Sequence, residues 1–400
     1  MLSESVMTSR DILAHLVGFN TVSSTSNLAL IDWVRGYLER HGIRSEVIRD
    51  ETGTKAHLWA TIGPDRDGGI VLSGHTDVVP VDGQPWTSDP FTLTERGGRL
   101  YGRGTADMKG FIAVALNAVE RFKAAALDRP VHLAFSYDEE IGCLGVPSLL
   151  EAINRFGVRP AACIVGEPTM MKLVVGHKGI LCARGHVRGL ECHSSMAPQG
   201  VNAVQYAARI IDFVRRETER RYKEGPFDHR FAPSSTTLHV GTVQGGTAFN
   251  IVPRDCEFDL EIRHLPTDDP HHILQSVERY CRDALEPEMR AVAPETGIAF
   301  SVFCDTPGLV ADPDSDIAAM VRRITGDNDG AVVAYTTEAG HYSRAGYPTI
   351  VCGPGSMEQG HKPDEFIEVS QLEAADRFMQ ALAGMLGRKE VPSGDTPRLG

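Results

Sequence analysis

The 400-residue sequence lacks several features that would mark a specialised class of protein. No apolar run approaches the ~20 residues that a membrane-spanning helix requires. Basic residues are outnumbered, with 40 Lys and Arg against 53 Asp and Glu, and the formal net charge is −13. Because phosphate recognition needs clustered Lys and Arg, this balance argues against a nucleic-acid partner or an anionic membrane surface.

The eight cysteines lack the spacing of a cysteine-built zinc site, because no two of them form a CxxC pair. The N-terminal segment has no basic stretch followed by an apolar core, so we expect no signal peptide. Reduced thiols in a cytoplasmic protein are therefore expected. The composition, 23% charged and 42% hydrophobic, is that of a soluble globular protein of about two domains.

Short apolar runs alternate with helix-like stretches between residues 57 and 182. Examples are the runs GIVLSGHTDVV and VHLAFSYDEE, which flank the helix-like stretch GFIAVALNAVERFKAAA. This alternation predicts an α/β layer with a mixed, mostly parallel sheet. In such sheets ligands gather at the carboxyl ends of the strands, so the polar residues that end these runs are candidates for function.

A different pattern occupies residues 183–306, where strand-like and helix-like segments follow in the order β-α-β-β-α-β. This order is typical of a ferredoxin-like α+β unit. After it, the runs AVVAYTTEAG and PTIVCGPG resume the α/β character. We therefore expect residues 1–182 and 307–400 to form a catalytic domain, and residues 183–306 to form an inserted lid and dimerisation domain.

Five segments at strand ends or in loops carry side chains of metal-ligand type. The segments are SGHTDVVP, GRGTADMKG, SYDEEIG, GEPT and GPGSMEQGHKPDE, with His75, Asp77, Asp107, Glu139, Glu140, Glu167 and His361 as the candidate residues. Two histidines with several carboxylates suit Zn²⁺, Co²⁺ or Mn²⁺ better than Ca²⁺. Any one of these residues alone could be a cap or a turn residue. Their joint occurrence at strand ends favours a metal site.

These segments, in this order, resemble the M20 family of dinuclear metal aminoacylases and carboxypeptidases, and the resemblance covers nearly the whole chain. Within the family, YTTEAG and VCGPGSMEQGHKPDEFIE are most similar to the acetylornithine deacetylases. The resemblance implies two divalent metal ions per subunit, with zinc expected and cobalt or manganese as alternatives. The implied metal ligands are His75, Asp107 and Glu167 for one ion, and Asp107 as a bridge, Glu140 and His361 for the other.

The resemblance also implies roles for residues beside the metals. Glu139 would be the general base, and Asp77 would orient His75. The segment LECHSSMAPQGVNAV resembles the family segment whose histidine stabilises the oxyanion, usually from the partner subunit, which makes His193 a candidate. By the match of GGTAFNIVPRDCEFDLEIR, Asn250 would help to hold the substrate and Arg263 would clamp its α-carboxylate.

Three further residues are candidates for substrate binding. Gly355 and Ser356 would offer donors to the same carboxylate. Glu338, in TTEAG, would contact a substrate ammonium, which favours an ornithine-like side chain; its alternative is a carboxylate at a helix N-terminus.

We therefore expect a cytoplasmic amidohydrolase that removes an acyl group from the α-amine of a small amino acid. The leading reaction converts N2-acetyl-L-ornithine to L-ornithine and acetate, within arginine biosynthesis. Alternatives are a succinyl-diaminopimelate desuccinylase and a broader N-acyl-amino-acid deacylase or carboxypeptidase. A non-catalytic binding relative would lack a ligand or the base, and every such position is filled here. A homodimer through the inserted domain is expected, because a histidine supplied in trans requires a partner.

Overall fold

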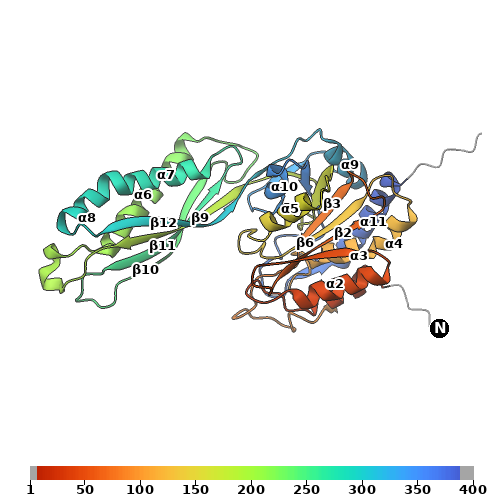
Figure 1. The fold of residues 1–400 in the computed structure, drawn as a ribbon, viewed down its shortest axis with the longest axis horizontal. Helices are drawn as coiled ribbons and strands as arrows, with labels where there is room; N and C mark the ends of the chain where they lie inside the picture. The colour runs from red at the N-terminus through yellow and green to blue at the C-terminus, as the bar shows by residue number, and fades with distance from the viewer. Residues whose placement is uncertain (1–6, 388–400) are drawn as a thin grey trace, which may run out of the picture.

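Residues 7–387 are described by a computed structural model, which divides them between two regions (Figure 1). We call residues 7–178 and 307–387 the body, and residues 179–306 the arm. In Figure 1 the body lies at the right and the arm extends from it to the left. The chain passes into the arm between β8 (Val174–His177) and β9 (Gly179–Arg188) and returns between β12 (Gly297–Thr306) and β13 (Leu309–Val310). The predictions for residues 1–6 and 388–400 lie outside the described residues.

A nine-stranded sheet forms the centre of the body, in the order β1-β2-β6-β3-β7-β15-β8-β13, with β14 beside β8. Its strands are β1 (Ser45–Arg49), β2 (Ala56–Ile62), β3 (Ile70–His75), β6 (Val131–Ser136), β7 (Ala162–Val165), β8 (Val174–His177), β13 (Leu309–Val310), β14 (Ala331–Val333) and β15 (Thr349–Val351). A smaller sheet contains β16 (Phe366–Glu368), β5 (Arg99–Tyr101) and β4 (Thr94–Arg96).

The main sheet is mixed, and its parallel pairs lie mainly at the centre. β6, β3, β7 and β15 run parallel to their neighbours in this order, whereas β1, β2 and β13 pair antiparallel. The prediction of a mostly parallel sheet therefore describes the centre better than the edges. The reason is local: β1 and β2 are joined by a turn over residues 50–55, which is too short for the crossover that a parallel pair requires.

Helices cover both faces of the main sheet. They are α1 (Ser9–Val17), α2 (Leu28–Arg40), α3 (Lys109–Asn117), α4 (Val119–Ala124), α5 (Val146–Arg155), α9 (Asp316–Thr325), α10 (Ala339–Arg344) and α11 (Val369–Leu386). One apolar core joins the sheet to α1–α4, α9 and α11, and a second joins it to α5 and α10. The central strands are buried on both sides, as their continuous apolar runs predict.

The arm is a four-stranded antiparallel sheet in the order β10-β11-β9-β12. Its elements are β9 (Gly179–Arg188), the 3₁₀ turn Ser194–Gln199, α6 (Ala203–Glu224), β10 (Thr237–Gly245), β11 (Asp255–His264), α7 (Pro270–Tyr280), the π turn Cys281–Leu285, α8 (Glu286–Val292) and β12 (Gly297–Thr306). Strands and helices thus follow the β-α-β-β-α-β order that the sequence predicts, with α7 and α8 in place of the second helix. The helices cover one face of the sheet around a separate apolar core, and the other face carries exposed residues such as Arg184.

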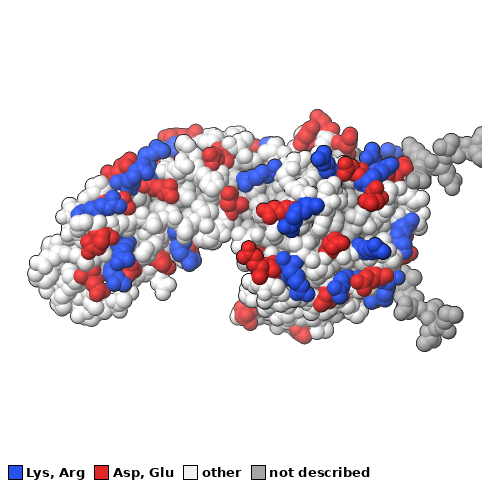
Figure 2. Space-filling view, in the orientation of Figure 1, with Lys and Arg blue, Asp and Glu red and all other residues white. Residues whose placement is uncertain are grey.

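Charges of both signs are intermixed on the face of the molecule that Figure 2 shows. On α6 this mixture consists of ion pairs within the helix, such as Arg215 with Asp212 and Glu219. No helix in the described part of the chain is long and apolar enough to cross a membrane.

Candidate metal centre

The centre of the sheet brings together side chains from three neighbouring parallel strands. His75 is the last residue of β3, Glu139 and Glu140 follow β6, and Glu167 follows β7. Because β6, β3 and β7 are adjacent and parallel, their carboxyl ends meet at one edge of the sheet. Asp107 reaches the same edge from the loop before α3.

Asp107 lies between two histidines. Its Oδ1 atom is 3.0 Å from Nε2 of His75, and its Oδ2 atom is 3.3 Å from Nε2 of His361. His75 Nε2 also lies 3.6 Å from Glu167 Oε1, and His361 Nε2 lies 3.0 Å from Glu140 Oε2. The five side chains that the sequence suggested as metal ligands therefore meet in one group, with Asp107 in the middle. We call this group of side chains the metal cluster.

The cluster is strongly perturbed electrostatically. Burial, together with the Asp107 carboxylate, raises the pKa of Glu140 to about 7, and burial raises the pKa values of Glu139 and Glu167 well above their usual range. Hydrogen bonds to Asp107 and Glu140 raise the pKa of His361 to about 10. Protonation of carboxylates and imidazoles reduces the negative charge of such a cluster. A bound cation would do the same and would displace the protons.

The donor atoms also have the chemistry and spacing that a divalent cation requires. Two groups of ligand atoms, each within 4.8 Å of one another, are His75, Glu139 and Glu167, and His75, Asp107 and Glu140. Glu167 Oε1 is buried and has no hydrogen-bond partner. Since a buried oxygen without a partner is costly, its position is best explained by a ligand that the cluster is built to hold.

Asp77 contributes in a different way from the prediction. Nδ1 of His75 lies 2.9 Å from the main-chain carbonyl oxygen of Asp77, whereas the Asp77 carboxylate is 3.7 Å away. That carboxylate accepts hydrogen bonds from the main-chain N–H groups of Glu139 and Glu140, at 3.1 and 3.2 Å, and from the Ser23 hydroxyl. Asp77 therefore orients His75 through its backbone and positions the Glu139–Glu140 segment through its side chain.

Glu365 is a positioning residue that the sequence reasoning missed. It is buried, accepts hydrogen bonds from the main-chain N–H groups of Ala106 and Asp107, and pairs with buried Arg103 at 2.8 Å. It thus fixes the loop that carries Asp107. The only available signal was its place in the DEFIE segment after His361. An acidic residue at such a place is equally compatible with a solvent-exposed position on the surface.

A cavity of about 200 Å³ opens beside the cluster. It is lined by Asp107, Glu139, Glu140, Gly142, Cys143, Glu167, Ile180, Arg263, Tyr335, Thr336, Met357 and His361. Arg263, predicted as a substrate clamp, comes from the end of β11 nearest the body and lies 3.1 Å from the Thr336 hydroxyl. Its other partner is Glu261, with both sides of this ion pair partly exposed. Tyr335 and Thr336 were not foreseen, because nothing in the AVVAYTTEAG run marks them.

His193 and Asn250 lie at the far end of the arm. They follow the distal ends of β9 and β10, and the main chain of Ser194 bonds to that of Asn250. Both side chains are exposed. Since β9 begins at the body and extends for ten residues, its two ends are about 30 Å apart. Within one chain of this structure, neither residue is brought to the metal cluster.

Glu338 does not face the cavity, so its predicted contact with a substrate ammonium is wrong. Its side chain is fully buried and accepts hydrogen bonds from the hydroxyls of Ser73 and Ser136, at 2.6 and 2.7 Å. These serines lie on β3 and β6, beneath the metal cluster. Burial raises the pKa of Glu338. A carboxyl enclosed in this way has no access to a substrate.

Gly355 and Ser356 are also displaced from their predicted role. They line a separate hollow with Met170 and Gln371, whereas the cavity beside the metal cluster receives the next residue, Met357. The main-chain N–H of Gly355 is already donated to the Gln371 side chain. The donors predicted for the substrate carboxylate are therefore occupied or directed elsewhere.

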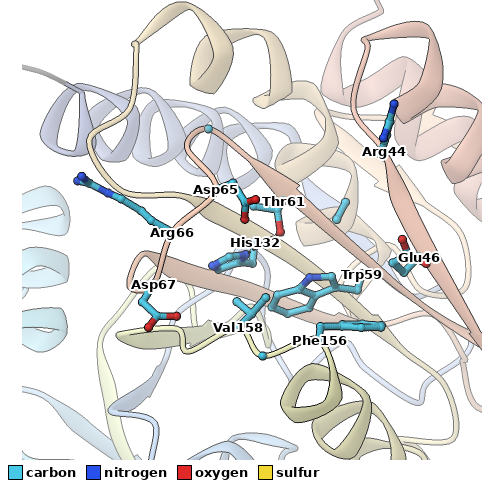
Figure 3. A pocket seen from close by; sticks show the side chains of 13 residues that line it. Arg44, Glu46, Trp59, Thr61, Asp65, Arg66, Asp67, His132, Phe156 and Val158 are labelled. Carbon is cyan, nitrogen blue, oxygen red and sulfur yellow. Dashed lines mark hydrogen bonds between the residues drawn. The ribbon is translucent and has the colours of Figure 1, made fainter.

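A larger hollow, of about 550 Å³, lies at the opposite end of the strands (Figure 3). Trp59 and His132 stack in it with ring centroids 4.8 Å apart, and Thr61 bonds to His132. His132 is close to the start of β6, whereas the metal cluster follows the ends of the strands. Burial lowers the pKa of His132 to about 4, so this imidazole is neutral at physiological pH. Size alone therefore does not identify the reactive site.

Comparison with known proteins decides the family. The model of peptidase family M20/M25/M40 matches residues 71–384. The chain belongs to this family. It is thus an enzyme of a hydrolase family, and the resemblance inferred from the sequence is confirmed.

Relatives and solved structures of the M20 family match most of the chain. An acetylornithine deacetylase from Proteus mirabilis is 34% identical over 382 residues, which cover 93% of this chain and 95% of that protein. One from Pectobacterium carotovorum is 35% identical over 86% of this chain and 87% of that protein. An M20 family metallo-carboxypeptidase from Sulfolobus solfataricus has a TM-score of 0.76 at 17% identity, covering 94% of this chain and 99% of its own. A dinuclear metal binding peptidase of the family from Bacillus subtilis has a TM-score of 0.64 at 16% identity, covering 94% and 97%. At these identities the structural likeness shows the fold.

Proposed function

We propose that the chain hydrolyses the N-acyl amide bond of a small amino acid, with two divalent metal ions per subunit, and that N2-acetyl-L-ornithine is its substrate. The observation that carries this proposal is the shared cavity, in which Arg263 lies beside the metal cluster. A volume of about 200 Å³ suits a small substrate rather than a long peptide. The named relatives, which match at 34 and 35% identity, support the acetylornithine assignment.

The donor set assigns the metal ions to particular residues. We assign His75 and Glu167 to one ion, Glu140 and His361 to the other, and Asp107 to both. Imidazole nitrogens mixed with carboxylates favour zinc, with cobalt or manganese as substitutes. When bound, two such ions would lower the pKa of a water molecule and polarise the carbonyl of the scissile amide.

The chain's own residues then perform the proton transfer. The Glu139 carboxyl lies in the cavity, with Oε2 4.0 Å from His75 Nε2. Its place in the cavity beside the metal cluster suits Glu139 to the role of general base. We assign Glu139 to accept the proton of the attacking water and to return it to the leaving amine. Asp77 holds Glu139 in place through the main-chain hydrogen bond of 3.1 Å.

Arg263 is assigned to the α-carboxylate of the substrate. A guanidinium can bind a carboxylate through two parallel hydrogen bonds, and Arg263 already binds the Glu261 carboxylate through Nε and Nη2, at 3.3 Å each. Both partners are partly exposed, so this ion pair contributes little, and a substrate carboxylate can replace it at low cost. The preference for ornithine rests on the relatives, since Glu338 is buried.

We further propose a homodimer in which the distal end of each arm serves the partner's active site. His193 is exposed at that end, and Phe249, which precedes Asn250 in the loop after β10, is fully exposed. β10 is an edge strand of the arm, and its last residues are exposed. An uncovered apolar side chain next to an unpaired edge favours contact with a second copy of this chain. All eight cysteines are free, which fits a cytoplasmic enzyme.

Metal analysis combined with a substrate panel tests the proposal. The purified protein should contain about two divalent ions per chain, and it should hydrolyse N2-acetyl-L-ornithine with the highest kcat/KM. The panel should include N-succinyl-diaminopimelate and N-acetyl derivatives of apolar amino acids. Preference for the succinyl substrate would favour the desuccinylase alternative, and preference for the apolar substrates a broader deacylase. A protein that binds metal and hydrolyses none of them would refute the proposed activity.

A further inference from the structure

Two cysteines face each other where the arm meets the body. Cys182 on β9 and Cys304 on β12 are direct partners in an antiparallel ladder, next to an irregularity between Val302 and Cys304. Residues directly opposite in such a ladder have Cα atoms roughly 4.5–5.5 Å apart. A disulfide needs a Cα separation of about 4.4–6.8 Å. Among the described residues, no other two cysteines are paired across a ladder.

The environments of the two thiols differ. Cys304 is buried, with 3% of its surface exposed, whereas Cys182 is partly exposed. A hydrogen bond between the two thiols lowers the pKa of Cys304 and raises that of Cys182. The thiolate is the reactive form of cysteine, and redox-sensitive cysteines are commonly placed next to a second cysteine that resolves the oxidised form. The two thiols are therefore placed so that one can be oxidised and the other can resolve the oxidised form.

We propose that Cys182 and Cys304 form a peroxide-sensitive dithiol that closes to a disulfide and slows the enzyme. One thiolate of the pair attacks hydrogen peroxide, so that an S–O bond forms, the O–O bond breaks and the released hydroxide is protonated to water. The other thiol then attacks the sulfenic sulfur, forming the S–S bond and releasing a second water. In sum, two thiols are oxidised to one disulfide, and one peroxide is reduced to two water molecules.

Cys304 is linked directly to the loop that carries the predicted base. Its Sγ lies 3.7 Å from the carbonyl oxygen of Gly142, and a Cβ atom added to Gly142 would come within 2.4 Å of it. The Thr306 hydroxyl donates to the same carbonyl at 2.8 Å. Gly142 in turn donates its N–H to the carbonyl of Glu139 at 2.9 Å.

Disulfide formation removes the thiol proton that faces Gly142 and draws the sulfur of Cys304 toward Cys182. Contact with the loop that holds Glu139 and Glu140 is thereby weakened. The expected loss of turnover rests on the proposed function, whereas formation of the disulfide does not.

The test treats the metal-loaded enzyme with increasing hydrogen peroxide and digests it without reduction. Mass spectrometry should find the peptides containing Cys182 and Cys304 joined, with the loss of two hydrogens, and dithiothreitol should separate them. Cys182→Ser and Cys304→Ser should each fail to form this disulfide, and a sulfenic acid on the remaining cysteine of the pair should be trapped by dimedone. Cys192→Ser is the matched control at another partly exposed cysteine, and it should form the disulfide like the wild type.

Activity is measured on the same samples. The wild type should lose several-fold in kcat and recover with dithiothreitol, whereas Cys304→Ser should keep its activity through the treatment. Oxidation of other cysteines before this pair would overturn the dithiol, and a disulfide without change in kcat would overturn the link to the loop. An enzyme inactive before treatment would refute the proposed function, and the peptide masses would still decide on the disulfide.

Discussion

Charged side chains converge in the interior of the body, whereas most ion pairs of the arm lie on its surface. The body buries Arg103 and Glu365 together, each side chain 1% exposed, next to the metal cluster. The arm pairs Arg209 with Glu288 at 42 and 52% exposure. Burial of a charged group lowers the stability of the fold unless a partner or ligand compensates the charge. In the body, the buried charges lie beside the proposed active site. The arm supplies Arg263 to the cavity from its near end and exposes His193 at its far end.

The largest expected effect comes from removing the base in the body. Glu139→Ala should lower kcat by about 10³-fold, because proton transfer by a positioned group contributes about 10²–10⁴-fold. The metal content should remain nearly that of the wild type, since Glu139 is assigned as base and not as ligand. Kinetics together with elemental analysis check this. Loss of both metal ions would show that base and ligand have been confused.

Breaking one ion pair in each region tests the contrast in stability. Arg103→Ala should lower the free energy of unfolding by about 3–5 kcal/mol, because it leaves the Glu365 carboxylate buried without its cation. Arg209→Ala, the matched change in the arm, should cost less than about 1 kcal/mol, since Arg209 and Glu288 are solvated and screened. Urea unfolding of both variants measures the difference. Equal costs would contradict the comparison.

His193 tests whether the arm serves the other subunit. His193→Ala should lower kcat by about 10²-fold, the typical cost of losing an oxyanion donor. When it is co-expressed with Glu139→Ala, isolated mixed dimers should recover about half of wild-type activity, because one of their two sites then has both residues intact. No recovery in isolated mixed dimers, or full activity of a strict monomer in sedimentation, would exclude a histidine acting in trans.

Acid should lower the free energy of unfolding gradually, through two buried histidines near the junction of the body and the arm. Burial lowers the pKa of His177 and that of His341 to about 4. Between about pH 6.5 and 4 the unfolded chain therefore binds protons that the folded chain excludes, so stability is complete above this window and falls within it. His177→Gln should flatten this decline by at most about 1.4 kcal/mol per pH unit in urea unfolding. An unchanged slope would show that His177 contributes nothing.

The sequence predicted which strand-end side chains would meet, because the carboxyl ends of parallel strands lie at one edge of a sheet. Residues that end adjacent parallel strands must meet, and His75 and Glu167 do so. The alternation of strands and helices in residues 183–306 was readable for a similar reason, since each element must bury one face.

The failures have a different physical origin. In a sequence, an acidic residue looks the same whether its side chain faces solvent, a substrate or a buried hydroxyl. For this reason Glu338 was assigned to the substrate and Glu365 was overlooked. Their roles depend on partners far along the chain, such as Ser73, 265 residues from Glu338. Asp77 shows the same limit on a smaller scale: the spacing foresaw its contact with His75, but not that the backbone would make it.

The attachment of the arm has an evolutionary and practical consequence. Ile180 and Thr306, at its entry and exit, are directly opposed partners on β9 and β12, so their Cα atoms are only about 5 Å apart. A segment whose ends nearly touch can be excised, lengthened or exchanged, and a bridge of a few residues closes the gap. Since Arg263 lies on β11 of the arm and the proposed metal ligands lie in the body, an arm can be exchanged between relatives without rebuilding the metal centre.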